Sequence, residues 1–131
     1  MADTLVGCSG HSLRSSMSQR GEVKPMTDMS QVSHAFQVFM KEAPAHQQAW
    51  LDAVQKLGAA SDLDAKTAKL VYIGILAAVR LESGLPFHVT DAKRSGATRQ
   101  EIVSAVLAGL PAVGNAVVQA LPVALAAYDG S

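Results

Sequence analysis

The chain has 131 residues, 49% of them apolar, which is enough for one domain with a hydrophobic core. Its 11 basic and 11 acidic side chains balance, and no block of like charge is present, so the sequence gives no sign of nucleic-acid binding. Aromatic residues make up only 5% and alanine is abundant, which favours closely packed helices over a β-sandwich.

Residues 1–27 are expected to form a flexible N-terminal tail, because serine and glycine are frequent there and apolar periodicity is absent. The tail contains the only cysteine, Cys8, so an internal disulfide and a thiolate zinc site are both excluded. The start, MADTLVGC, lacks the features of a signal peptide, and the longest apolar run, 70–79, is shorter than the roughly 20 residues that a membrane span needs. We therefore expect a cytoplasmic protein that does not enter a membrane.

The rest of the chain, 28–131, is expected to be one all-α domain of about six helices. Apolar residues recur at helical spacing from Val32 onward. Pro44 then opens a second amphipathic helix that is expected to end near Gly58. No strand pattern and no internal repeat is evident in this part of the sequence.

The third helix, predicted over 64–80, is apolar on every side in its second half, so we expect it to be buried and central. Gly74 would let a neighbouring helix approach closely. Lys66 and Lys69, near the start of this helix, are expected to lie along an exposed edge.

A fourth helix is predicted to start within ESGLPFHV, with Ser83 as its N-cap and Pro86 in its first turn. Gly96 is expected to end this helix, and a capping box between Thr98 and Glu101 opens the fifth. The last helix is rich in alanine and valine and is predicted to run to about Tyr128, with a kink at Pro122. The low charge of these last two helices suggests burial against another subunit.

Residues 63–110 read LDAKTAKLVYIGILAAVRLESGLPFHVTDAKRSGATRQEIVSAVLAGL. This stretch resembles the core repeat of the carboxymuconolactone decarboxylase family, which also contains the alkylhydroperoxidase D-like proteins. The segments LDAKT, FHV and GATRQEI carry the resemblance. It implies an alkylhydroperoxidase D-like helical bundle that assembles into a symmetric homo-oligomer, a trimer or a hexamer. It also implies a functional site at the start of the helix that bears His88.

The peroxidase branch of that family pairs two cysteines, CxxC, with a histidine four residues after the second cysteine. Here the two cysteine positions hold Leu81 and Gly84, and the position of an upstream glutamate holds Lys69. Only His88 of this redox centre is present. Because thiol peroxidase chemistry needs a thiolate and a resolving partner, we expect the family's alkylhydroperoxidase or peroxiredoxin activity to be absent.

His88 can support chemistry of another kind. The positive end of its helix favours the neutral imidazole, whereas Asp91, three residues on, favours the charged form. A neutral imidazole can accept a proton or hydrogen-bond a ligand. Glu82 is expected to be its acid–base partner if the turn between the two residues folds back. Alternatively, His88 has a structural role and satisfies buried backbone groups.

The sequence therefore predicts a protein that binds or acts on a small organic molecule in an apolar pocket near His88, with His88 and Glu82 as catalytic residues. Two alternatives stay open: a lyase or isomerase acting on a lactone or small organic acid, with Arg80 as the nearest anion-binding candidate, and a non-enzymatic oligomer with a vestigial site. We expect no cofactor, and no metal, because the histidines lack metal-ligand spacing. The expected partners are further copies of the chain and a small-molecule ligand.

Overall fold

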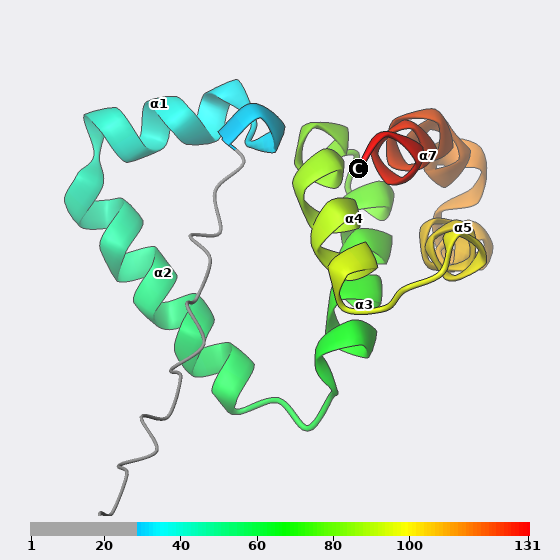
Figure 1. Cartoon of the computed structure of the whole chain (residues 1–131), viewed down its shortest axis with the longest axis horizontal. Coiled ribbons are helices and arrows are strands. Elements are labelled where there is room, and N and C mark those ends of the chain that lie inside the picture. Colours follow the sequence, from blue (N-terminus) through cyan, green and yellow to red (C-terminus); the bar gives the residue numbers. More distant parts are fainter. Residues whose placement is uncertain (1–28) are drawn as a thin grey trace, which may run out of the picture.

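The structure, a computed structural model, describes residues 29–131 (Figure 1). The expected N-terminal tail and Cys8 lie outside these residues. The helices are α1 (His34–Glu42), α2 (Pro44–Ala59), α3 (Ala65–Ala78), α4 (Leu85–Arg94), α5 (Arg99–Leu107), α6 (Leu110–Val113) and α7 (Leu121–Gly130), with short 3-10 segments η1 (Met29–Gln31), η2 (Glu82–Gly84) and η3 (Gly114–Ala120). No strand occurs in the described part of the chain, which confirms the all-α class.

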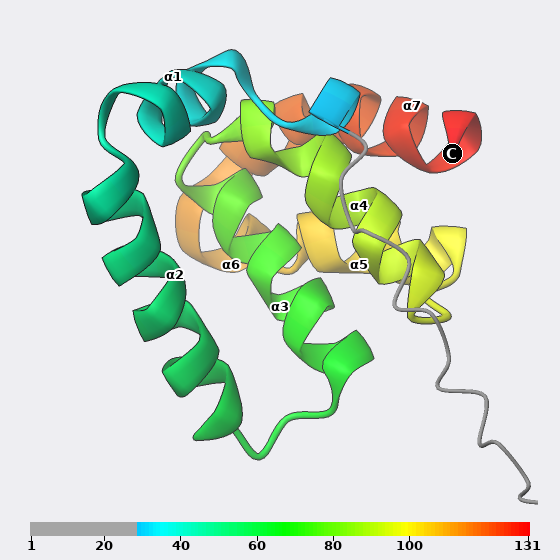
Figure 2. The ribbon, with the colours of Figure 1, turned by 60° about the vertical axis from the view of Figure 1, so that its left-hand side comes forward.

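The hydrophobic core lies among α3, α4, α5 and α7, which pack side by side (Figure 2). Its largest fully buried side chains are Ile73, Leu85, Val89, Ile102, Val106 and Val117. The approach of α3 to α5 is especially close at Gly74, where an added Cβ would lie 2.9 Å from the carbonyl oxygen of Ala105. The sequence-based reading of Gly74 as a close-packing position is therefore confirmed.

One face of α3 is exposed, so the prediction that this helix is buried all round was wrong. Ile73 and Ala77 are fully buried, but Val71, Ile75 and Val79 are 48%, 52% and 56% exposed. The reason is that the chain's own first two helices do not cover this face.

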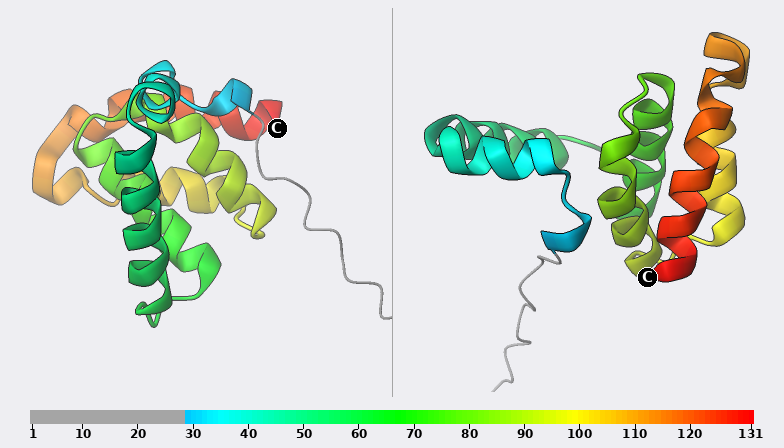
Figure 3. Two further views of the ribbon diagram at one scale, coloured as in Figure 1. Left: turned by 90° about the vertical axis from the view of Figure 1, so that its left-hand side faces the viewer. Right: turned by 90° about the horizontal axis from the view of Figure 1, so that it is seen from above.

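Helices α1 and α2 form an arm that projects from the four-helix core, and neither contains a buried residue (Figure 3). Aromatic packing joins the two helices, with the ring of Phe36 5.9 Å from Phe39 and 5.7 Å from Trp50. The amide of Gln37 donates to the carbonyl oxygen of Val32 over 2.9 Å and so ties α1 to the segment that precedes it.

Two helices of the core end in the same way, with one residue in the left-handed conformation. After α4 this residue is Gly96, with φ of 90°, as the sequence predicts. After α3 it is Arg80, with φ of 62°. Leu81 N–H then donates to the carbonyl of Leu76 over 2.9 Å, and Ala97 N–H donates to that of Ala92 over 3.0 Å, which completes a Schellman motif in each case.

The starts of α4 and α5 differ from each other. The capping box of Thr98 and Glu101 is present at α5, as predicted. At α4, however, the N-cap is Gly84 without a side-chain cap, so the prediction of Ser83 was wrong. The reason is that η2 runs directly into α4, and a backbone bond from Leu85 N–H to the carbonyl of Glu82 occupies the place of a cap.

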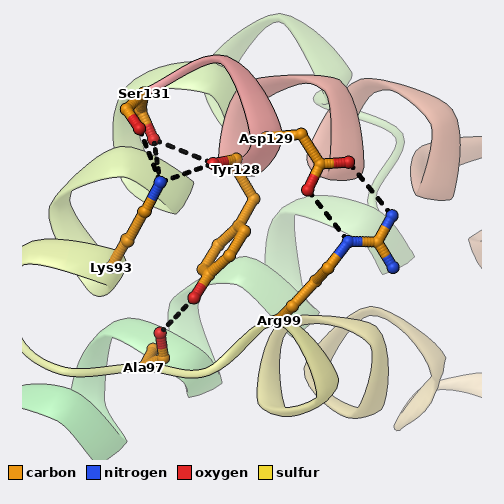
Figure 4. Close-up of polar contacts among 6 residues, drawn as sticks. All are labelled: Lys93, Ala97, Arg99, Tyr128, Asp129 and Ser131. Carbon is orange, nitrogen blue, oxygen red and sulfur yellow. Dashed lines mark hydrogen bonds and ion pairs between the residues drawn. The ribbon is translucent and has the colours of Figure 1, made fainter.

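The C-terminal end of α7 is fixed to α4 and α5 by polar contacts (Figure 4). The ammonium of Lys93 lies 4.7 Å from the centre of the Tyr128 ring and donates to the Tyr128 carbonyl over 2.8 Å. The Tyr128 hydroxyl donates to the carbonyl of Ala97 over 3.1 Å. Arg99 and Asp129 form a two-pronged ion pair at 2.9 and 3.1 Å. These contacts hold the last helix in register with the core.

By length and composition alone, the stretch Arg99–Gly130 is apolar enough to cross a membrane, because an 18-residue window within it has a mean hydropathy of 1.7. In the structure this stretch is divided into α5, α6, η3 and α7, and α5 packs against α7. Pro122 lies in the first turn of α7, where its missing N–H is tolerated, so it starts a helix and does not kink one as expected.

Candidate functional site

His88 lies in the first turns of α4 and faces α3. Its ring is 4.5 Å from the ring of Tyr72, centre to centre, with the two planes tilted by 53°. Phe87 packs edge-on against the same imidazole at 5.1 Å. His88 is half-buried between these rings, and its imidazole makes no hydrogen bond to any residue within 29–131. A ring nitrogen is therefore available to a ligand.

The electrostatic surroundings of His88 favour the neutral imidazole. Burial lowers the pKa of His88 below the ordinary histidine value, Asp91 acts in the opposite direction, and Lys69 adds to the lowering. The sequence also indicates a neutral imidazole, from the position at a helix start, whereas in the structure the main cause is removal of the ring from water.

Beside His88, an ion pair connects α3 to α4. The Lys69 ammonium lies 2.9 Å from an Asp91 carboxylate oxygen and donates to the Ser95 hydroxyl over 2.7 Å. The side chains of Lys69 and Asp91 are only 29% and 18% exposed. The expectation that Lys69 lies on an exposed edge was therefore wrong, because α4 packs against this side of α3 and supplies the carboxylate.

Lys66, one turn earlier, also has a partner from another helix. Its ammonium lies 2.9 Å from Glu101, and the two side chains are each 37% exposed. This pair joins the start of α3 to the start of α5. Glu101 therefore caps its own helix and anchors its neighbour at the same time.

Glu82 is directed to a different partner from the one predicted. Its carboxylate accepts from the Nε of Arg80 over 2.7 Å, and neither a hydrogen bond nor an ion pair joins it to His88. Arg80, the candidate for binding an anion, is engaged in this pair. The roles of His88 and Glu82 in catalysis stay predictions, and for Glu82 such a role requires release from Arg80.

Two hollows on the described surface lie away from His88. One, of about 320 Å³, is between η1 and the ends of α4 and α7, where Gln31 and Val32 face Pro86 and Ala126. The other, of about 260 Å³, is formed by aromatic side chains of the arm. Neither is lined by His88 or Tyr72, so the apolar pocket near His88 also stays a prediction.

The structure brings together residues that the sequence did not assign to the site, namely Tyr72, Lys69 and Ser95. A signal for them is present in the spacing. Lys69 and Tyr72 are three residues apart on α3, and His88 and Asp91 are three residues apart on α4, so each pair lies on one helix face. Lys69 on one face and Asp91 on the other carry opposite charges, which indicates that the two faces can pack together. The sequence alone, however, does not show which helices are neighbours.

Fold and site together define an all-α protein with a neutral histidine at the start of a core helix and a lysine–carboxylate pair beside it. Comparison with family models then identifies the chain: residues 44–126, more than half of it, match the model of the carboxymuconolactone decarboxylase family. The chain belongs to this family. Searches of the curated proteins and of the solved structures find no match to it.

Proposed function

We propose that this family member binds and acts on a small organic molecule through the neutral imidazole of His88, without thiol redox chemistry. The observation that supports the proposal is the half-buried ring of His88 against Tyr72, with no hydrogen-bond partner among residues 29–131. A neutral, desolvated imidazole without a partner is suited to accept a proton or to hydrogen-bond a ligand.

The sequence argues against family-type peroxidase activity. Leu81 and Gly84 occupy the positions of the two cysteines, and Cys8 is the only sulfhydryl in the chain. Without a thiolate at the site, peroxide has no nucleophile to attack it, and without a second cysteine no internal disulfide can form.

A lyase or isomerase acting on a lactone or small organic acid is the more specific form of this proposal. A lysine ammonium has three N–H donors. Lys69 directs two of them to Asp91 and Ser95, which leaves one donor available. A carboxylate bound by that donor would lie beside a neutral imidazole. His88 could then remove a proton next to the carbonyl group of the bound molecule and return it to a different carbon, which moves the double bond and is the step of an isomerase.

The test is binding and turnover of carboxymuconolactone by the full-length protein. We expect wild type to consume the lactone, which is measured by the change in ultraviolet absorbance of the lactone. We also expect the ligand to shift the His88 ring signals in nuclear magnetic resonance spectra. His88→Gln should lose turnover by at least about 100-fold, as expected for loss of a general base. His46→Gln is the matched control, because His46 is exposed on α2.

The same experiment separates the alternatives. Equal turnover by wild type and His88→Gln would contradict the proposal. Binding without turnover would favour a ligand-binding protein, and the absence of both would favour a vestigial site. Reduction of cumene hydroperoxide by wild type that is lost in Cys8→Ser would restore the peroxidase interpretation.

A further inference from the structure

We infer that the aromatic hollow of the arm, lined by Phe36, Phe39 and Trp50, binds a small quaternary ammonium compound such as choline. The hollow lies between α1 and α2 and has a volume of about 260 Å³. Among the residues that the structure describes, only these three side chains line it. The hollow is separate from His88, so the inference does not depend on the function proposed above.

Half of the chain's aromatic side chains gather at this one place. The whole sequence contains three phenylalanines, two tyrosines and one tryptophan. Phe36 and Phe39 are one turn apart on α1, and Trp50 meets them from α2. Burial in a core does not explain the cluster, because neither helix contains a buried residue and Trp50 is 45% exposed. The cluster therefore presents aromatic surface to a ligand in solution.

The three rings are inclined to one another and form the walls of the hollow. The plane of Phe36 is inclined by 70° to that of Phe39 and by 59° to that of Trp50, with ring centres 5.9 and 5.7 Å apart. Inclined rings do not cover each other's faces as stacked rings do, so π faces stay open toward the hollow. The face of an aromatic ring carries partial negative charge and attracts a cation, most strongly in tryptophan.

The lining contains no hydrogen-bond acceptor, and this selects among cations. A lysine-type ammonium has three N–H donors and is strongly hydrated, so it would lose its hydrogen bonds to water here and gain none. A quaternary ammonium has no N–H group, and its methyl groups pack against the rings while its charge is attracted by their faces. A trimethylammonium group has four non-hydrogen atoms, and at about 30 Å³ for each, the size of a water molecule, it needs about 120 Å³. The hollow is large enough to hold it.

The charges next to the rings also favour a cation. Glu42 is one turn after Phe39 on α1, so its carboxylate comes from the side of the helix that bears the rings. Lys41 is two residues after Phe39 and therefore lies on the opposite side of α1. Its ammonium is 3.6 Å from the Glu42 carboxylate, and both side chains are well exposed, so water screens this pair. No basic side chain lines the hollow itself.

Trp50 is the only tryptophan of the chain, so its fluorescence reports on the hollow directly. Choline chloride added to the full-length protein should change the Trp50 emission saturably in the millimolar range, compared with sodium chloride at the same ionic strength. The matched ligand is 3,3-dimethylbutan-1-ol, which has the shape of choline with carbon in place of the charged nitrogen. Choline should bind at least about five-fold more tightly, the ratio that corresponds to a cation–π attraction of about 1 kcal/mol. Equal affinities, or no saturable change with choline, would overturn the inference.

Phe39→Leu separates the attraction of the charge from simple packing, because leucine keeps an apolar wall and removes a π face. It should weaken choline binding by at least about three-fold and affect binding of the alcohol less. Tyr72→Leu is the matched control, because Tyr72 packs against His88 outside the hollow. Saturation-transfer nuclear magnetic resonance on the choline methyl signal measures binding in these variants wherever on the protein it occurs.

Two results would place the hollow in a different role. If Tyr72→Leu weakens choline binding and Phe39→Leu does not, the cation binds beside His88, which contradicts the inference. If the Trp50 emission of the free protein moves to longer wavelength on dilution and choline has no effect on it, another copy of the chain fills the hollow, and the inference is also wrong.

Discussion

Tyr72 and His88 face each other across α3 and α4 with their ring centres 4.5 Å apart. Tyr72 is itself 40% exposed, and the face of its ring that meets the imidazole covers part of His88. Since burial is the largest cause of the lowered pKa of His88, the tyrosine ring is one of the groups that set the protonation state of the site.

Tyr72→Ala should raise the pKa of His88 toward the ordinary histidine value, because water then reaches the ring. The measurement is the titration of the His88 ring signals by nuclear magnetic resonance. Tyr128→Phe is the control, because its hydroxyl bonds to Ala97, away from the site. An unchanged His88 titration in Tyr72→Ala would mean that other groups exclude the water.

The stability of the protein should depend on pH through His88. Because its pKa is lower in the folded state, the unfolded chain takes up the proton first as the pH falls. The free energy of unfolding should therefore decrease as the pH falls below about 6.5, and this decrease should level off below the folded pKa.

Urea unfolding of wild type and His88→Gln at about pH 7.5 and about pH 5.5 measures this contribution as a difference. The wild type should lose more stability than the variant between the two values. A larger loss in the variant would mean that folding raises the pKa of His88, which contradicts this prediction.

Lys69→Met should destabilise the fold by about 1–2 kcal/mol, which lies between the typical losses for exposed and for buried ion pairs. The reason is that the carboxylate of Asp91, only 18% exposed, loses its cationic partner. It should also raise the pKa of His88, because Lys69 lowers it and Asp91 raises it. Thermal unfolding and the His88 titration measure the two effects. Lys66→Met, which breaks the more exposed pair with Glu101, should leave His88 unchanged.

Two glycine substitutions should have opposite effects on stability. Gly74→Ala should destabilise by about 2 kcal/mol, because its Cβ would meet the Ala105 carbonyl oxygen at 2.9 Å and force α3 from α5. Gly58→Ala meets no atom within 4 Å and should stabilise α2 by up to about 1 kcal/mol through helix propensity. Denaturant midpoints compare the two, and equal effects would contradict the close approach of α3 to α5.

The two left-handed residues give another matched pair. Gly96→Ala should destabilise by about 1 kcal/mol, whereas Arg80→Gly relieves a backbone conformation that disfavours a side chain and should stabilise by up to about 1 kcal/mol. Arg80→Gly also releases Glu82 from its partner. If Glu82 is the acid–base partner of His88, the His88 pKa should rise in this variant, and no change would argue against that role.

Local patterns determined most of the helices. Pro44, Gly96 and the Thr98–Glu101 capping box each mark a helix end through the backbone conformation or bonds of a few neighbouring residues, so these ends could be predicted from the sequence. Ser83 was misjudged because a cap and a 3-10 turn compete for the same backbone groups, and their sequence signals are alike.

The sequence by itself determined the all-α class, the family and the place of His88 at the start of a helix, because these depend on residue types and short spacings. Only the tertiary structure decided that Tyr72 contacts His88, that Lys69 pairs with Asp91 and that Glu82 turns to Arg80. Such contacts depend on which helices are neighbours and on how each is rotated about its axis. That choice comes from burial of the whole core and not from any local pattern.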